Sequence, residues 1–185
     1  MASKIDLISN ALILIGDNPI NSLTGGSRAA QVGSNLYDGI VQMELSKHRW
    51  GFARRKAQLS LTTETIPDDE YRSVYQLPTD LITLIKIKPN IDYQIYGDKV
   101  YCNLSQALYC DYVANVAESE WPPYFSKMIE YALATDFASS IRDSASSADR
   151  MVSMYLNAAK AARSIDSMQH PPTPIVSNPF IAVRY

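Results

Sequence analysis

Charge is scarce in this chain of 185 residues, and neither sign dominates. Charged residues make up 19% of the sequence, below the roughly 25% that is typical of soluble domains. The 17 Lys and Arg residues against 19 Asp and Glu residues give a formal net charge of −2, which argues against a basic domain dedicated to nucleic acid. A small charged share is also typical of a chain that buries surface against other chains, so we expect an oligomer.

Long apolar runs and cysteine are scarce too. The longest apolar runs are short pieces such as Ala11–Ile15, whereas a membrane-spanning helix needs about 20 apolar residues. The first six residues place no basic segment before an apolar one, so we expect no signal peptide. Cys102 and Cys110 have no CxxC partner, and such sparse use is typical of a reducing cytosol. The sequence predicts a soluble cytoplasmic protein without a structural disulfide.

Motifs that carry catalytic chemistry are absent from the sequence. It holds no P-loop, no dinucleotide-binding glycine pattern and no nucleophile elbow. Glu44 and His48 stand four residues apart and could share a metal ion, but nothing nearby supplies the further ligands that a zinc site needs. His170 lies in a proline-rich segment, where it is poorly placed for general-base work. We therefore expect no enzyme activity, no catalytic residue, no metal site and no cofactor.

Helical periodicity marks both ends of the chain, with two helices before and two after the middle third. Capping residues or proline mark the four starts, at Ser3, Ser27, Pro122 and Ser146. Each segment carries one apolar stripe at helical spacing, so we expect the first two helices to pack as a hairpin. The predicted helices cover residues 3–16, 27–49, 122–142 and 146–169.

The middle third alternates polar and apolar residues, which is the pattern of strands. Gly97-Asp98 separates two short runs of this kind and predicts a two-residue hairpin. A second hairpin, turning at residues 103–106, would place Cys102 opposite residue 107. Residues 62–70 form an acidic loop. We expect strands within residues 50–61, 81–88, 93–96, 99–102 and 107–113.

These patterns predict an α+β fold. Two N-terminal and two C-terminal helices would form a four-helix bundle-like domain, with a small antiparallel β-sheet inserted and an extended C-terminal tail. The helical domain would comprise residues 1–60 and 120–169, the β region residues 61–119, and the tail residues 170–185.

The densest charge lies in residues 47–56, where five cations are interleaved with two aromatic residues. On one interpretation the cations contact phosphates and the rings stack on bases, as in a nucleic-acid-binding module. On the other, the two rings fill the joint between bundle and sheet, and the arginines pair with carboxylates, such as those of residues 62–70, in the same or a neighbouring subunit. The candidate residues are Lys47, Arg49, Trp50, Phe52, Arg54, Arg55 and Lys56.

The C-terminal tail, residues 170–185, is the second informative feature. Its four prolines exclude a helix and favour an extended chain. Its apolar groups either fold back on the same domain or dock into a partner, and an extended segment of this length can reach about 45–50 Å. The candidate docking residues are Pro171, Pro172, Pro174, Ile175, Pro179, Phe180, Ile181, Val183 and Tyr185.

Several stretches of the sequence resemble one known family. In the N-terminal half they are Asn10–Gly16, Ile20–Leu23, Leu36–Asp38 and His48–Ala57, and in the middle Tyr75–Asp80 and Tyr96–Lys99. On these residues the chain resembles phage tail tubular protein A, a family of head-to-tail adaptors of short-tailed phages. The likeness covers most of residues 5–168, although residues 122–168 match only in character and the tail has no counterpart.

The resemblance implies a structural virion protein without catalytic activity. Such adaptors form a ring, typically of twelve copies, between the portal protein and the tail nozzle protein, and the genomic DNA passes through its central channel. The resemblance also implies a location in the host cytoplasm during assembly and then in the tail or neck of the virion, without membrane contact. A near-neutral charge agrees with this role, because a strongly basic channel would hold the passing phosphate backbone.

Overall fold

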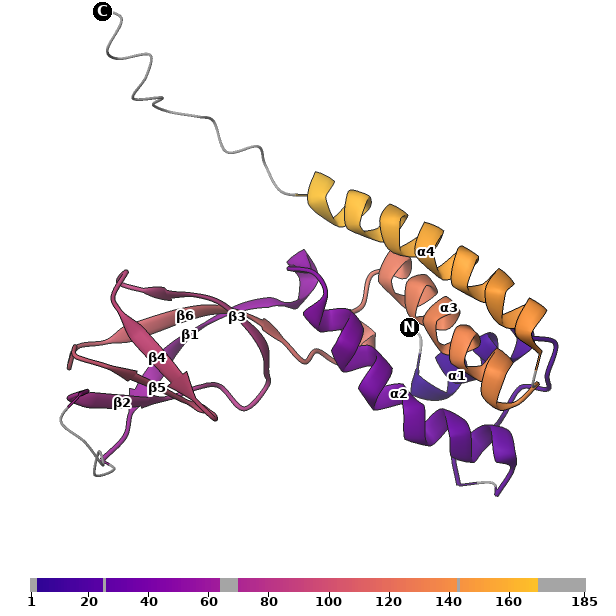
Figure 1. Cartoon of the computed structure of the whole chain (residues 1–185), viewed down its shortest axis with the longest axis horizontal. Helices are drawn as coiled ribbons and strands as arrows, with labels where there is room; N and C mark the ends of the chain where they lie inside the picture. The colour runs from indigo at the N-terminus through magenta and orange to yellow at the C-terminus, as the bar shows by residue number, and fades with distance from the viewer. Residues whose placement is uncertain (1–2, 25, 64–69, 143, 170–185) are drawn as a thin grey trace, which may run out of the picture.

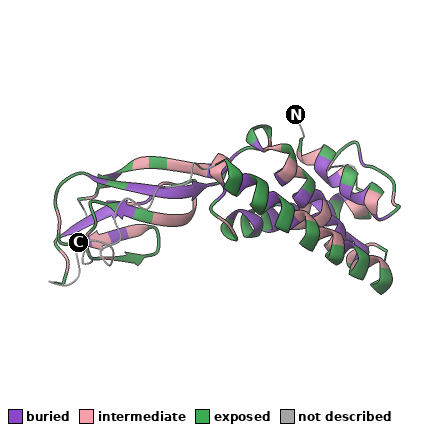
Figure 2. Ribbon diagram, turned by 90° about the horizontal axis from the view of Figure 1, so that it is seen from above, coloured by how far each residue is buried: buried purple, intermediate pink, exposed green. Residues whose placement is uncertain are grey.

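The computed structural model of the chain describes residues 3–24, 26–63, 70–142 and 144–169. These residues form two lobes that lie end to end, one made of helices and the other of strands (Figure 1). Two linking segments, residues 47–53 and 115–122, connect the lobes, and we call the region where they pass between the lobes the joint. Seen from above, the molecule is elongated, with buried residues on the inner side of each lobe (Figure 2).

The described residues form four α-helices, close to the predicted ranges: α1 Lys4–Leu14, α2 Arg28–Ser46, α3 Pro123–Ser140 and α4 Ala145–Met168. Ser3 and Asp6 form the predicted capping box of α1, and Ser27 caps α2. The prediction for α4 is wrong by two residues. Its N-cap is Ser144, whose side chain accepts a hydrogen bond from the Ser147 backbone N–H.

Helix α3 is the centre of the helical lobe and packs against α1, α2 and α4. It can do so because apolar residues cover most of its circumference, among them the fully buried Phe125, Ile129 and Phe137. The expected hairpin of α1 and α2 is therefore not the main contact of either helix. The two approach each other where Gly33 leaves room for Ile8, since a Cβ at Gly33 would lie 2.8 Å from the Ile8 side chain.

The sheet has six strands, all in antiparallel pairs, in the order β3-β6-β1-β2-β5-β4, and it curls like half a barrel. The strand bounds are β1 Arg54–Leu61, β2 Ser73–Gln76, β3 Leu81–Lys88, β4 Tyr93–Tyr96, β5 Lys99–Cys102 and β6 Leu108–Ala114. The predicted hairpin of β4 and β5 around Gly97-Asp98 is present. Gly97 has a φ of 62°, which glycine adopts at little cost.

The predicted fold, a four-helix bundle with a small inserted sheet, is wrong. The sheet is large and forms a lobe of its own, so the fold is α+β with two separate lobes. The difference comes from β1, which starts at Arg54 and lies in the middle of the sheet. Its first part pairs with β6 through Leu59, and its last residues, Ser60 and Leu61, pair with β2.

Strand β2 is absent from the prediction because both of its faces are buried, and such a strand shows no alternation of polar and apolar residues. The predicted hairpin at residues 103–106 is also wrong. Strand β6 pairs with β3 and β1 instead of β5, so Cys102 does not lie opposite residue 107. Cys102 and Cys110 are both buried free thiols.

One continuous apolar core runs from the helical lobe through the joint into the sheet. It includes Leu12 of α1, Trp50 of the linking segment and Leu108 of β6, all nearly or fully buried. None of the helices in the described part of the chain combines the length and the hydropathy needed to cross a membrane.

Candidate functional site

Four aromatic rings meet in the joint, where the linking segments pass between the lobes. Trp50 and Phe52 follow α2, Trp121 precedes α3, and Phe125 lies in the first turn of α3. The ring of Phe125 contacts the other three, with centroid distances of 5.0 Å to Trp50, 4.8 Å to Phe52 and 5.0 Å to Trp121. Edge-to-face and tilted contacts of this kind add to the stability gained by burial.

The polar atoms of the two indole rings are paired inside the joint. Trp50 Nε1 donates to the backbone oxygen of Glu44 at 2.9 Å, and Trp121 Nε1 donates to that of Val116 at 3.0 Å. Because both N–H groups are satisfied, the rings can be buried without a desolvation penalty for an unpaired donor.

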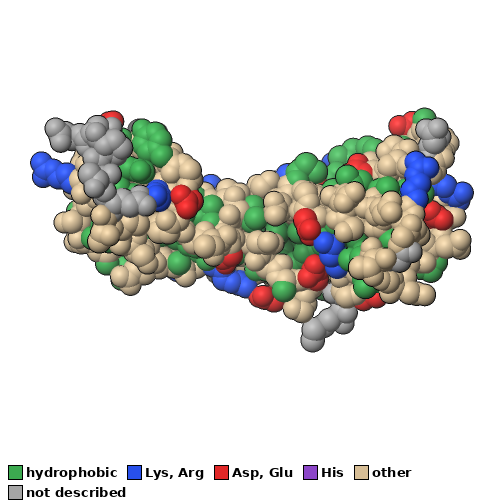
Figure 3. All heavy atoms as spheres, turned by 90° about the horizontal axis from the view of Figure 1, so that it is seen from below, with side chains coloured by type: hydrophobic (Ala, Val, Ile, Leu, Met, Phe, Trp, Pro, Cys, Tyr) green, Lys and Arg blue, Asp and Glu red, His purple; other side chains and the backbone are tan. Residues whose placement is uncertain are grey.

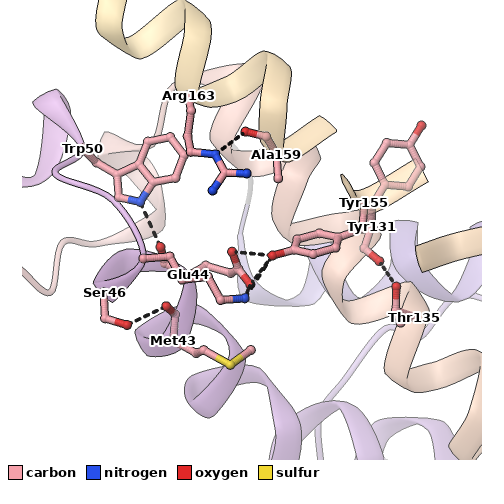
Figure 4. Close-up of polar contacts among 10 residues, drawn as sticks. Met43, Glu44, Ser46, Trp50, Tyr131, Thr135, Tyr155, Ala159 and Arg163 are labelled. Atoms are coloured by element: carbon pink, nitrogen blue, oxygen red, sulfur yellow. Dashed lines mark hydrogen bonds and ion pairs between the residues drawn. The ribbon is translucent and has the colours of Figure 1, made fainter. Parts of the chain in front are cut away.

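A buried carboxylate ties the end of α2 to α4. Glu44 is only 2% exposed, and its side chain accepts hydrogen bonds from Lys47 Nζ at 2.6 Å and from the Tyr155 hydroxyl at 2.8 Å. Figure 4 shows Glu44 and Tyr155 pointing toward each other between the two helices. Burial alone would lower the pKa of Lys47, but the hydrogen bonds to Glu44 and Tyr155 raise it above its ordinary value.

A second buried carboxylate ties the end of α4 to the linking segment. Asp166 is 1% exposed, and both of its oxygens lie 3.0 Å from the Gly51 backbone N–H. It also accepts from the Tyr124 hydroxyl at 2.9 Å and lies 3.4 Å from His48 Nε2. Burial and the bond to Asp166 raise the pKa of Tyr124, so the phenol stays protonated and donates.

The arginines of the basic stretch do not form one patch. Arg55 pairs with Glu120 and donates to the backbone oxygens of Phe52 and Arg54. This carboxylate belongs to the short helix η2 (Glu118–Glu120) in the other linking segment. Most of the loop at residues 62–70, the source of carboxylates expected from the sequence, lies outside the described residues.

The remaining cations of the stretch face different surroundings. Arg49 is exposed and Arg54 half-buried, and both line a hollow of about 260 Å³ together with His48 and Asp166. Lys56 is exposed on β1. The structure thus gathers the two aromatic residues of the predicted site in the joint and distributes its cations over the joint and the sheet.

Because Trp50 is 1% exposed and Phe52 packs on Phe125, these rings are not placed to stack on bases. The geometry is that of a joint which fixes how the two lobes sit relative to each other. The tail candidates, from Pro171 to Tyr185, lie outside the described residues.

The outer surface of α4 is a feature that sequence reasoning did not single out. Only Met151, Ala159, Ala162 and Asp166 of this helix are buried. Large apolar side chains remain exposed along it, including Leu156 at 48% and Met168 at 79%. The signal in the sequence is an apolar stripe wider than one neighbouring helix can cover, since α4 packs mainly against α3.

The molecule narrows between the lobes, and charged side chains of both signs are scattered over the face seen from below (Figure 3). Within the four described ranges, no three His, Cys, Asp or Glu side chains are grouped as a metal ion would require.

No protein-family model matches the chain, and no curated protein matches it at a significant level. The resemblance to phage head-to-tail adaptors therefore stays a prediction that rests on the stretches quoted above, and the function is proposed on that basis together with the exposed surface of α4.

Proposed function

We propose that this protein is a structural head-to-tail adaptor, which assembles with copies of itself into a ring between a portal protein and a tail nozzle protein. The observation that carries the proposal is the exposed apolar surface of α4. The resemblance of His48–Ala57 and Tyr75–Asp80 to the adaptor family supports the same function. The protein acts by shape and adhesion, without catalysis, and DNA passes through the centre of the ring.

Helix α4 has the properties of a subunit interface. Val152 and Leu156 stand one turn apart on one flank of the helix, and Ile165 and Met168 lie on the other flank near its end. Leaving such side chains in water forgoes about 25 cal/mol for each Å² of apolar surface. A neighbouring copy that covers α4 recovers this free energy.

A ring needs a second, different adhesive face on each subunit, because a closed cyclic assembly uses heterologous contacts. The helical lobe exposes further large apolar side chains away from α4, Ile13 on α1 at 55% and Met43 on α2 at 49%. We assign these helices to the complementary face. The joint supports this role as well. Its packed rings and hydrogen-bonded carboxylates hold the lobes at a constant angle, and a constant angle lets identical subunits close a ring.

The test replaces an exposed apolar residue of α4 by a charge. Leu156→Glu should leave the isolated protein folded and should abolish ring assembly on the portal protein, because the interface would have to bury an unpaired carboxylate. Gln58→Glu is the matched control, since it puts the same charge on an exposed residue of β1, away from α4. Electron microscopy of the protein mixed with its portal protein measures the outcome.

Rings of the Leu156→Glu variant that equal those of the unsubstituted protein would contradict the role of α4. Absence of any ring or portal complex with the unsubstituted protein would contradict the adaptor function itself. Deletion of residues 171–185 adds a second arm. It should leave a folded protein that no longer attaches to the portal protein, and retained attachment would contradict docking by the tail.

A further inference from the structure

The outer face of the sheet carries lysine and tyrosine side chains that the proposed function does not use. Along β1, side chains alternate between the two faces. Ala57 and Leu59 face the core of the lobe, and Leu59 is buried. Lys56, Gln58 and Ser60 face the opposite side and are exposed.

The pairing of β3, β6 and β1 sets two rows of side chains on this outer face. In one row Lys86 lies opposite Asp111, which lies opposite Lys56. Lys86 Nζ is 3.4 Å from Asp111 Oδ2, which confirms that their side chains share one face. Asp111 is only 5% exposed, so this row presents two ammonium groups above one buried carboxylate.

The second row lies two residues further along the strands. Here Lys88 is opposite Tyr109, which is opposite Gln58. Lys88 is exposed, and Tyr109 is 49% exposed. Lys56 and Lys88 form no ion pair with any residue in the described ranges, so both charges are available to an external partner.

The outer face continues over the other half of the sheet. Ser60 is opposite Gln76, which pairs with Lys99, and Lys99 lies opposite Tyr96 on β4. Tyr96 is 55% exposed, and its ring stands edge-on to Tyr101 at a centroid distance of 5.2 Å. Exposed aromatic rings therefore stand on both halves of one face.

We propose that this outer face binds single-stranded nucleic acid, with Lys56, Lys86 and Lys88 on the phosphates and Tyr109 stacked on a base. Open sheet faces that combine cations with exposed aromatic rings suit this ligand, because unpaired bases offer a flat surface to each ring. A duplex keeps its bases stacked on one another, so Tyr109 cannot reach them. Lysines alone would accept any polyanion, and the exposed tyrosines among them favour nucleic acid over an acidic protein.

This site is distinct from the joint and does not depend on ring formation. A chain with a net charge of −2 can bind a polyanion only where its cations are locally concentrated. The outer face meets this condition, since the rows of β3, β6 and β1 hold three lysines and a single carboxylate, which is buried.

The test measures binding of a labelled oligothymidylate by fluorescence anisotropy. A length of about 20 nucleotides covers the site of one module. The salt concentration is low, about 50 mM NaCl, because phosphate contacts are strong there. The double variant Lys56→Gln/Lys88→Gln should bind about tenfold more weakly, and its slope of log K against log salt should be smaller by about 1.4. Tyr109→Ala should weaken binding by about five- to a hundredfold with the salt slope unchanged.

The matched control is Arg28→Gln/Lys160→Gln, which removes the same charge from exposed positions of the helical lobe and should bind as the unsubstituted protein does. A duplex of equal length should bind more weakly and should not respond to Tyr109→Ala. No binding of the oligothymidylate, or equal losses in the control and the sheet variants, would overturn the proposal. Tighter binding of an oligoglutamate peptide than of the oligothymidylate would overturn it in favour of an acidic protein partner.

Discussion

At the scale of single residues, Asp136 shows how burial and charge compete near the joint. It lies in the last turns of α3, where burial raises the pKa of its carboxyl group and the nearby Lys47 ammonium lowers it in part. Its carboxylate accepts no hydrogen bond from another described residue. A carboxylate near a helix C-terminus also interacts unfavourably with the helix dipole. In the native protein at neutral pH, this side chain is therefore destabilising.

Asp136→Asn should raise the free energy of unfolding at pH 7 by about 0.3–1 kcal/mol. The native pKa of Asp136 lies above the ordinary value of 3.8, so the native state binds this proton more tightly than the unfolded state. The ionised carboxyl group therefore destabilises the native state at pH values above the native pKa, and this destabilisation disappears as the pH falls toward 3.8. Urea unfolding at neutral pH and near pH 4.5 measures the free energy of unfolding of the variant and of the unsubstituted protein. The difference between the two free energies should be smaller at the lower pH.

The control for this measurement is Asp92→Asn, which changes an exposed carboxylate in the loop before β4. It should leave the free energy of unfolding unchanged at either pH. A variant at Asp136 that is less stable than the unsubstituted protein at pH 7 would show that the carboxylate is stabilising, against the argument from burial.

At the scale of secondary structure, the start of α4 separates two serines that look alike in the sequence. Ser146 and Asp149 match a helix start signal, yet the side chain that accepts from the helix backbone is that of Ser144. The hydrogen bond is long, 3.4 Å from the Ser147 nitrogen to Ser144 Oγ, so its contribution lies at the lower end of the range for N-caps.

Ser144→Ala should therefore lower the free energy of unfolding by about 0.5–1 kcal/mol. Ser146→Ala, inside the first turn, should be neutral or slightly stabilising, because alanine is the better helix former. Thermal unfolding followed by circular dichroism compares the two variants. A larger loss for Ser146→Ala would place the helix start where the sequence pattern put it.

Elements with local signals were predictable from the sequence, and those fixed by distant partners were not. The capping box of Ser3 and the turn at Gly97-Asp98 act over a few residues, and both structures are present. The size of the sheet depends on β1, whose partners β2 and β6 lie far along the chain, and its alternation does not reveal them.

The candidate site also depends on residues that are distant in the sequence, so only part of it could be predicted. That Trp50 and Phe52 could fill the joint was one of two interpretations, and the sequence could not choose between them. The choice depends on Phe125 and Trp121, which come from a segment about 70 residues later. The partner of Arg55, Glu120, is equally remote, 65 residues further along the chain, so no local pattern in the sequence indicates this pair.

At the scale of the whole molecule, the joint couples two lobes that look separable in outline. The apolar core is continuous through it, and the buried carboxylates of Glu44 and Asp166 bind groups from different segments. Both tryptophans of the sequence, Trp50 and Trp121, lie in this joint. Tryptophan fluorescence therefore reports the joint, while circular dichroism at helical wavelengths reports the helical lobe.

Because the core is shared, we expect one cooperative transition, in which fluorescence and circular dichroism give the same urea midpoint. Hydrogen exchange should give equal opening free energies for β6 and α3, one element from each lobe. Asp166→Asn should shift all three measurements together by about 1–3 kcal/mol. Its amide oxygen can still accept from Tyr124, but its NH2 group would take the place of Oδ2, which accepts from the Gly51 N–H and lies 3.4 Å from His48 Nε2. A fluorescence midpoint at lower urea than the helical midpoint in the unsubstituted protein would contradict the coupling, since the joint would then open while the helices remain folded.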